Sequence, residues 1–452
     1  MMMNRPPFYL LLALFSSLFW GPTCVPVEQT TASSGATSGK SEYYASTALR
    51  YEDFVYDPTI KSVQCYVQTG NAEEVFNAPV VPLVQTEPIM LEFDQLNTPQ
   101  QRFTVKFVYC NLDWTEARLT QIQFMDEFNE FYITDALSSY NTKVPYFHYR
   151  FQLPRVKLPG NYLVVVTDRS GNPIITRRLL VYDNRVTVAA KSVLPVGTEE
   201  RATNQQIDFN ILYPEYPVVN PSQEIKVVLR QNSRWDNAKT NLRPSFVHDT
   251  QKRLEYTFFN GASSFPGLKE YRGFDDRNLR GRGFNVEAVS LEANPVEVKL
   301  YPEKNRSREV YSQDVDINGK MVYENRRFGS TNTGDPDYVL VTFALAAPDP
   351  VPGDVYVFGQ LSDWKLTPEF KLTYVPAAQQ YAGKIMLKQG YYNYSFALQV
   401  ANQPQKANEA YFEGSHFQTR NTYDVLVYYR PPGTRTDLLI GYQWLETNGT
   451  RR

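Results

Sequence analysis

The stretch LKQGYYNYSF, residues 387–396, places four aromatic rings in ten positions and alternates as a β-strand does. Successive side chains of a strand point to opposite faces, so Tyr392, Tyr394 and Phe396 share one face while Tyr391 lies on the other. Because a strand of a β-sandwich buries one face against a second sheet, we expect Tyr392, Tyr394 and Phe396 in a core. Tyr391 is expected near the surface.

Short alternating runs of this kind recur along the chain, for example RFTVKFVYC (102–110) and IITRRLLVY (174–182). The 30 prolines, 32 tyrosines and 27 phenylalanines among 452 residues are typical of antiparallel β structure. At about 150 residues per domain, the length suggests about three domains. We therefore predict an all-β protein of tandem immunoglobulin-like β-sandwiches. The net charge of −2 gives no general attraction to nucleic acid or anionic membranes.

The N-terminal residues have the pattern of a secretory signal. Arg5 precedes an apolar run of 13 residues (8–20), which is too short to span a bilayer, since a spanning helix needs about 20. We predict a signal peptide at 1–24 and export to the periplasm. Cys24 stands where a bacterial lipoprotein carries its lipid, but the preceding Gly-Pro-Thr departs from the usual lipobox. Lipidation and simple cleavage both stay open.

The remaining chain divides into a linker and three β regions. Residues 25–48 are rich in Ser, Thr, Ala and Gly, which predicts a flexible linker. The predicted β domains are 49–185, 186–335 and 336–446. Within the first of them, LTQIQFMDEFNEF (119–131) is either one helix or an irregular crossover.

One loop has the beginning of a calcium motif. DVDINGKMVYEN (314–325) resembles an EF-hand loop, but the bidentate glutamate that calcium needs at the twelfth position is Asn325. Its Asn318-Gly319 pair is a strong signal for a two-residue turn, because both residues tolerate positive φ. We therefore predict a β-hairpin here and no metal site.

Catalytic motifs are missing from the sequence, which has no G-x-S-x-G, P-loop or Rossmann fingerprint. A glycosidase pair of carboxylates can be imagined, but no sequence spacing certifies the separation that such a pair requires. The candidate acids are Asp113, Glu116, Asp126, Glu127 and Glu130. The three histidines, His148, His248 and His416, lie in no metal or triad motif. We predict a protein that is not an enzyme and holds no cofactor.

Two cysteines besides Cys24 lie in strand-like runs of the first predicted domain. In an oxidising compartment Cys65 and Cys110 could form a disulfide, and two buried free thiols are an equal alternative.

Two segments combine arginine with aromatic residues, the side chains that dominate protein interfaces. They are RQNSRWDNAKTNLRP (230–244) and YRGFDDRNLRGRGFN (271–285). We interpret both as candidate partner-binding surfaces; the alternative is that their arginines pair with Asp275 and Asp276 inside the domain. The candidate residues are Arg234, Trp235, Tyr271, Arg272, Phe274, Arg277, Arg280, Arg282 and Phe284.

Taken together, several short motifs resemble one family. VYCNLDW, LPGNYLVVV, RQNSRWDNA, YRGFDDRNL, DVDINGK, DPDYVLVTFAL and LKQGYYNYSF occur in the order seen in the type IX secretion system plug proteins of Bacteroidetes. The resemblance covers residues from about 50 to 400. One departure is Tyr109, which stands where the family commonly has a histidine before the cysteine.

The resemblance implies a periplasmic accessory subunit that docks on the outer-membrane translocon barrel and closes its pore when idle. DVYVFGQLSDWKL (354–366) with LKQGYYNYSF is also similar to starch- and glycogen-binding β-sandwiches, in which aromatic rings stack on sugars. Trp364 and Tyr391 are the candidate residues for stacking on a sugar or a partner. A periplasmic or surface carbohydrate-binding protein is therefore the alternative function.

Overall fold

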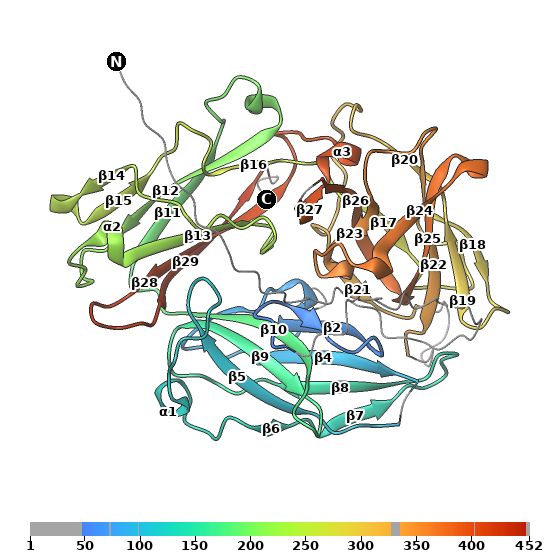
Figure 1. Ribbon diagram of the computed structural model, residues 1–452, viewed down its shortest axis with the longest axis horizontal. Coiled ribbons are helices and arrows are strands. Elements are labelled where there is room, and N and C mark those ends of the chain that lie inside the picture. Colours follow the sequence, from blue (N-terminus) through green and yellow to red (C-terminus); the bar gives the residue numbers. More distant parts are fainter. Residues whose placement is uncertain (1–47, 72–73, 98, 327–334, 402, 449–452) are drawn as a thin grey trace, which may run out of the picture. The chain divides into compact units, whose positions relative to one another are not determined.

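The computed structural model describes residues 48–71, 74–97, 99–326, 335–401 and 403–448, all of which belong to one compact unit (Figure 1). The predicted signal peptide 1–24, Cys24 and the linker 25–48 as far as residue 47 lie outside these residues. The described chain is almost entirely β, with five sheets and only short helices, so the all-β prediction is confirmed. None of the helices in these ranges has the length and apolar character needed to cross a bilayer.

The first sandwich consists of two sheets that share one core. Phe93 and Tyr149 of one sheet pack in the same cluster as Phe107, Val164 and other side chains of the facing sheet. The first sheet, in the order β1-β10-β9-β5-β6 with β3 also pairing with β10, contains β1 (Phe54–Val55), β3 (Val80–Pro82), β5 (Thr104–Cys110), β6 (Phe131–Tyr132), β9 (Gly160–Thr167) and β10 (Pro173–Tyr182). The second, in the order β2-β4-β8-β7, contains β2 (Ile60–Val67), β4 (Ile89–Leu96), β7 (Asp135–Ser138) and β8 (Tyr146–Gln152).

The second sandwich is discontinuous in sequence. Its core joins Ile207 and Phe209 of one sheet with Val227, Val425 and Val427 of the other. The first of these sheets contains β11 (Thr187–Val193), β12 (Asn204–Leu212), β14 (Phe246–His248), β15 (Arg253–Tyr256) and β16 (Ser264–Pro266). The other is β13 (Ile225–Gln231), β28 (Asn421–Tyr429) and β29 (Leu438–Thr447), so the red C-terminal strands lie beside green β13 in Figure 1.

The third sandwich is one sheet of eleven strands that curls over its own core. Tyr394 of β26 meets Phe343 of β22 across that core, with ring centroids 5.2 Å apart. The strands are β17 (Arg272–Asp275), β18 (Val286–Ser290), β19 (Val296–Leu300), β20 (Glu303–Lys304), β21 (Met321–Tyr323), β22 (Tyr338–Ala346), β23 (Val355–Phe358), β24 (Lys371–Val375), β25 (Gln380–Lys388), β26 (Gly390–Val400) and β27 (Gln403–Asn408).

Strand β26 confirms the alternation seen in the sequence. Tyr392, Tyr394 and Phe396 are at most 1% exposed and lie in the core of the third sandwich, whereas Tyr391 is half-buried. The alternation succeeds because side-chain direction in a strand is a local property of the backbone.

The strand pairing does not follow the predicted boundary between residues 335 and 336. Strands β17–β21 come from the predicted second domain but pair within the sheet of β22–β27. Strands β28 and β29 come from the predicted third domain but pair with β13, with Ile225 opposite Tyr429. Those boundaries were wrong because alternation marks strands without showing which distant strand completes their backbone hydrogen bonds.

The segment 119–131 is a crossover and not a helix of any length. Only α1 (Gln121–Phe124) forms a single turn there, as do α2 (Pro221–Glu224) and α3 (Ala410–Glu413) elsewhere. The chain then passes through β6, at the edge of one sheet, to β7, at the edge of the facing sheet.

Candidate functional site

Trp235 lies at the junction of the first and second sandwiches. Its indole ring is contacted by the guanidinium groups of Arg178 and Arg230, at 4.9 and 4.5 Å from the centroid. Trp114 of the first sandwich packs edge-on against it, with ring centroids 5.1 Å apart, and Arg178 also covers Trp114 at 4.3 Å. Cation–π and aromatic contacts are strongest where water is excluded, so this stack holds the two sandwiches together.

Arg230 completes the stack from within the second sandwich. It forms a bidentate pair with Asp424, at 2.9 and 2.5 Å, and both side chains are 3% exposed. Burial opposes the charged guanidinium, but Asp424 outweighs it and raises the pKa of Arg230. The fork of the guanidinium fixes the plane of its contact with Trp235.

Arg234 connects the same segment to the third sandwich. Its guanidinium pairs with Asp236 at 2.6 Å and with Glu409 at 2.8 Å, and it covers the ring of Trp364 at 4.2 Å. Burial opposes its charge, but Asp236 and Glu409 together raise the pKa of Arg234 well above its usual value. The segment 230–235, called the junction segment below, therefore contacts all three sandwiches.

The interpretation of the junction segment as an exposed partner surface is corrected by this burial. Arg234 is 3% exposed and Trp235 is half-buried, and both make their contacts inside the chain. Arginine and aromatic residues are as typical of a buried interface within a chain as of one between chains, and the sequence does not separate the two cases.

The second segment, 271–285, is divided between core and surface. Tyr271, Arg272 and Phe274 are buried, with Arg272 paired to Glu413 at 3.0 Å. Phe274 stacks on a core tyrosine of β26. These three residues are therefore not available to a partner in this structure.

The rest of that segment is more open. Arg277 is half-buried and pairs with Asp275 at 2.5 Å and with Glu324 at 3.1 Å. Arg280, Arg282 and Phe284 are exposed, Phe284 by 66%. Of the predicted partner residues, these last three alone keep an exposed side chain.

Asp276 is buried without a cationic partner, unlike the neighbouring Asp275. One carboxylate oxygen accepts the amide of Gly390 at 2.6 Å, and the other has no hydrogen-bond partner. Burial raises the pKa of Asp276 to about 7. The expectation that Asp276 pairs with an arginine was wrong, whereas Asp275 does pair with Arg277.

The predicted stacking residues are both half-buried, and the guanidinium of Arg277 lies 5.5 Å from the centroid of the Tyr391 ring. Trp364 is half-buried against Tyr271 and Phe358, with ring centroids 5.9 and 5.6 Å away. Asn318 and Gly319 form a turn, both at positive φ, but the predicted hairpin was wrong, because β20 pairs with β22 and β21 pairs with β26. A Cβ atom on Gly319 would lie 2.4 Å from Trp364. Glycine is therefore required for the turn to pack against this ring.

The acidic and histidine candidates do not gather into a reactive site. Asp113 accepts hydrogen bonds from Thr115, and Glu116 accepts one from Tyr51. His148 pairs with buried Asp94 at 2.7 Å. Within the described ranges no group of three or more His, Cys, Asp or Glu side chains could hold a metal ion. The remaining candidates are surface acids Asp126, Glu127 and Glu130, and the separate histidines His248 and His416.

Cys65 and Cys110 are free thiols, so the disulfide alternative is corrected. Cys65 lies on β2 and Cys110 ends β5, and these strands belong to different sheets of the first sandwich. Burial raises the pKa of each thiol to about 12. Both cysteines are therefore protonated and unreactive near neutral pH.

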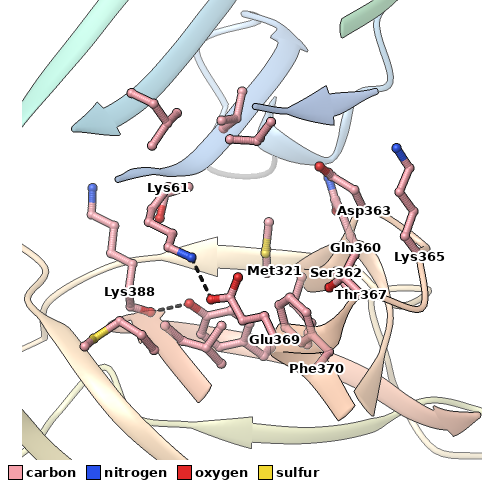
Figure 2. A pocket seen from close by; sticks show the side chains of 18 of the residues that line it. Lys61, Met321, Gln360, Ser362, Asp363, Lys365, Thr367, Glu369, Phe370 and Lys388 are labelled. Carbon is pink, nitrogen blue, oxygen red and sulfur yellow. Dashed lines mark hydrogen bonds and ion pairs between the residues drawn. The ribbon is translucent and has the colours of Figure 1, made fainter. Parts of the chain in front are cut away.

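The first and third sandwiches meet through ion pairs. Lys61 and Glu369 point toward each other in Figure 2 and pair at 2.6 Å. Lys388 extends toward the first sandwich and pairs at 2.6 Å with Asp94, which is 1% exposed. A small pocket of about 110 Å³ lies beside these pairs, too small for a typical ligand.

One exposed apolar feature was missed by the sequence reasoning. Of the twenty large hydrophobic residues that are exposed among the described residues, five lie within residues 122–140. We call them the apolar edge: Ile122 (74% exposed), Phe128 (74%), Tyr132 (65%), Leu137 (61%) and Tyr140 (61%). They lie on α1, β6, β7 and the segments that connect and follow them.

The apolar edge spans the crossover between the two sheets of the first sandwich. Phe131 and Ala136 pack on the core between these sheets, so the neighbouring Tyr132 and Leu137 point outward from their own sheets. Tyr132 is on β6 and Leu137 on β7, the terminal strands of the two facing sheets. Around them, Asp126 pairs with Lys157 at 2.6 Å and lies on the same crossover. The signal in the sequence was the run FMDEFNEF, whose Phe124, Phe128 and Phe131 have helical spacing although only a single helical turn forms, so Phe124 is buried and Phe128 is exposed.

The comparisons with known proteins agree with this architecture. Residues 60–183 match the family described as the type 9 secretion system plug protein 1st domain. A crystal structure of a hypothetical protein from Parabacteroides merdae is similar over 88% of this chain and 100% of its own, with 31% identity and a TM-score of 0.81. A comparison with curated proteins finds no match.

Fold and site thus define the class of protein: several β-sandwiches joined by buried arginines, with an exposed apolar edge. The chain belongs to the type IX secretion system plug protein family. That family is non-enzymatic and related to secretion, which gives this chain a role connected with type IX secretion. In this member, Tyr109 is buried with its hydroxyl 2.7 and 2.8 Å from the carbonyl oxygens of Pro159 and Asp437, so it joins the first sandwich to the second.

Replacing Arg234 by methionine should destabilise the protein strongly. The substitution leaves the buried carboxylate of Glu409 without its cation, which costs about 3–5 kcal/mol. Chemical unfolding followed by tryptophan fluorescence measures this loss. Arg280→Met removes the same charge from an exposed position and should change the unfolding midpoint little. Equal effects of the two substitutions would contradict the role of the junction segment.

Replacing Asp276 by asparagine should stabilise the protein more at pH 8 than at pH 5. The folded protein holds a proton on Asp276 up to about pH 7, while the unfolded chain loses it near pH 4, so the free energy of unfolding falls as pH rises between these values. The Asp276→Asn variant lacks this carboxyl group, so its free energy of unfolding does not fall for this reason. Urea unfolding at both pH values checks the sign.

The matched control is Asp275→Asn. Arg277 holds the pKa of Asp275 below its ordinary value despite burial, so both states are ionised above pH 5. Its effect on stability should be the same at pH 5 and pH 8. A pH-independent effect of Asp276→Asn would show that its carboxyl group is ionised in the folded protein.

Proposed function

We propose that the protein docks from the periplasmic side on the outer-membrane barrel of the type IX translocon and closes its pore when no substrate is passing. The observation that carries this proposal is the family match together with full-length similarity to a solved relative. The identity of the partner is inferred from the family. The manner of closure is argued from the physical properties of the chain.

A wide pore explains why such a subunit is needed. A barrel of many strands encloses a water-filled lumen, and an open lumen wide enough for folded cargo would abolish the permeability barrier. A stopper for such a pore must be stiff. The junction segment supports stiffness, because its buried Arg234 loses Glu409 of the third sandwich if the sandwiches separate, at a cost of several kcal/mol.

The apolar edge is the surface that we propose contacts the barrel. Its five large side chains lie on the first sandwich, inside the residues that match the plug family. Apolar and aromatic residues supply most of the binding energy of an interface when a partner covers them. A contact of five side chains, with Asp126, Glu127 and Glu130 between them in the sequence, is small enough to be released.

Export completes the proposal. The predicted signal peptide 1–24 would deliver the protein to the periplasm, and a lipid on Cys24 would tether it to the membrane that holds its partner. Carbohydrate binding has no comparable support, since Trp364 packs against Tyr271, Phe358 and Arg234.

Removing the apolar edge should weaken the complex. In a mild-detergent extract, the wild-type protein is expected to co-purify with the translocon barrel. The triple variant Phe128→Ser, Tyr132→Ser and Leu137→Ser should reduce recovery of the barrel about tenfold or more, as for loss of an interface hot spot. The control Phe259→Ser alters a residue 71% exposed on the second sandwich and should leave recovery unchanged.

The same strains test closure. Cells that carry the triple variant should admit bulky antibiotics more readily than cells with the wild-type protein or the control. Undiminished recovery of the barrel by the triple variant would exclude the apolar edge as the contact, and failure of the wild-type protein to accompany the barrel would overturn the proposed function.

A further inference from the structure

A cavity of about 760 Å³ lies where the three sandwiches meet. Its lining includes Arg178 from the first sandwich, Trp235 from the second and Lys320 from the third. Exposed residues at Asn77 and Gln405 also line it, so the cavity opens to solvent. A volume between about 300 and 1,000 Å³ is the size of ligand-binding sites in proteins.

The lining carries more cations than anions, although the whole chain has a net charge of −2. The cationic residues are Arg50, Arg177, Arg178, Arg234, Lys320 and Lys365, and the carboxylates are Glu52, Asp53, Asp236 and Asp363. An enclosed surplus of positive charge in an acidic protein is not explained by the overall composition. It concentrates anions in the cavity.

Ion pairs within the chain compensate most of these charges, but two of the cations form no ion pair with a described residue. Arg177 pairs with Asp363 at 3.1 Å, Lys365 pairs with Glu52 at 3.1 Å, and Arg234 pairs as described above. Among the described residues, neither Arg178 nor Lys320 has a carboxylate within ion-pair distance. The carboxylate of Asp53 accepts the backbone amide of Arg178 at 2.6 Å instead of its guanidinium.

Lys320 is the more exceptional of the two. The turn at Asn318 and Gly319 directs it into the cavity, where its ammonium donates to the carbonyl oxygen of Phe76 at 2.8 Å. Burial alone lowers the pKa of Lys320 to about 8. Lys320 is half-buried, and its ammonium also lies 5.9 Å from the centroid of the Phe76 ring. With one hydrogen bond made, two of its donors are left for a group in the cavity.

The remaining walls are suited to a peptide more than to a small anion. Aromatic rings of Phe76, Trp235 and Trp364 line the cavity. Amide side chains that can bond a peptide backbone also line it, at Asn77, Asn232, Gln360, Gln399 and Gln405. A small inorganic anion would need the cations but neither the rings nor the several amides.

We propose that this cavity binds an acidic peptide segment, with one carboxylate of the peptide at the ammonium group of Lys320. The amides around the cavity hold the peptide backbone, and the rings contact its side chains. This site is separate from the apolar edge, and the proposal holds whether or not the protein docks on a translocon.

Fluorescence anisotropy with the isolated full chain tests the site. The probe is a fluorescein-labelled, capped octapeptide of alternating glutamate and glycine, compared with its lysine and glycine counterpart. The glutamate peptide should bind and the lysine peptide should not. Lys320→Met should weaken binding about tenfold or more, the loss of one charge-assisted hydrogen bond.

The control is Lys191→Met, which removes an exposed lysine from β11, away from the cavity. It should bind the glutamate peptide as the wild-type protein does. Equal binding by Lys320→Met, equal binding of both peptides, or binding of inorganic phosphate without binding of the glutamate peptide would each overturn the proposal.

A second measurement needs no variant. Acetylation of Lys320 by a succinimidyl ester, followed by peptide mass spectrometry, should slow several-fold when the glutamate peptide is present and stay unchanged with the lysine peptide. Unchanged acetylation with both peptides would contradict a carboxylate at Lys320, even if Lys320→Met does not fold.

Discussion

The contact on which the rest of the structure depends is the one that Trp235 makes between two arginines. Arg178 comes from the first sandwich and Arg230 from the second, and both guanidinium groups lie within 5 Å of the indole centroid. Two like charges can share one ring in a buried place only if each is compensated. Asp424 compensates Arg230, while Arg178 donates to the carbonyl oxygen of Tyr51. Four positions further along the chain from Arg230, Arg234 extends the same junction to Glu409 of the third sandwich.

The two junctions of the first sandwich each combine apolar and charged contacts. Its contact with the second sandwich includes an apolar cluster, with Leu163 and Val165 of β9 packed among Val228 and Leu426. Its contact with the third includes a smaller apolar cluster, in which Tyr146 packs edge-on against Tyr338, and the buried pair of Lys388 with Asp94. Buried ion pairs are screened by salt much less than exposed ones, so neither junction depends on surface charge alone.

The sequence predicted the features that depend on neighbouring residues, and it did not predict those that depend on residues far apart in the chain. The buried face of β26 follows from alternation among Tyr392, Tyr394 and Phe396, which is a local property. The turn at Asn318 and Gly319 is equally local. The domain boundary failed because the pairing of β13 with β28 joins strands about two hundred residues apart, which alternation does not encode.

The candidate site shows the same division. The sequence singled out Arg234 and Trp235 as interface residues, and they do lie at an interface, but one within the chain. Their exposure was mispredicted because Glu409 and Asp424, which neutralise the arginines, lie far away in the sequence. The apolar edge was missed since Phe128 has helical spacing with Phe124 and Phe131, which predicts a buried face, and since the edge position of β7, which leaves Leu137 exposed, is set by strands far away in the sequence.

The central claim is that the apolar edge of the first sandwich faces the translocon barrel in the cell. Site-specific photo-crosslinking in living cells tests it most directly, with the photoreactive residue placed at position 128 in one strain and at position 259 in another. Both positions are exposed phenylalanines, Phe128 by 74% and Phe259 by 71%. A crosslink to the barrel from position 128 and none from position 259 is the predicted result. A crosslink from position 259 alone, or from neither position, would contradict it.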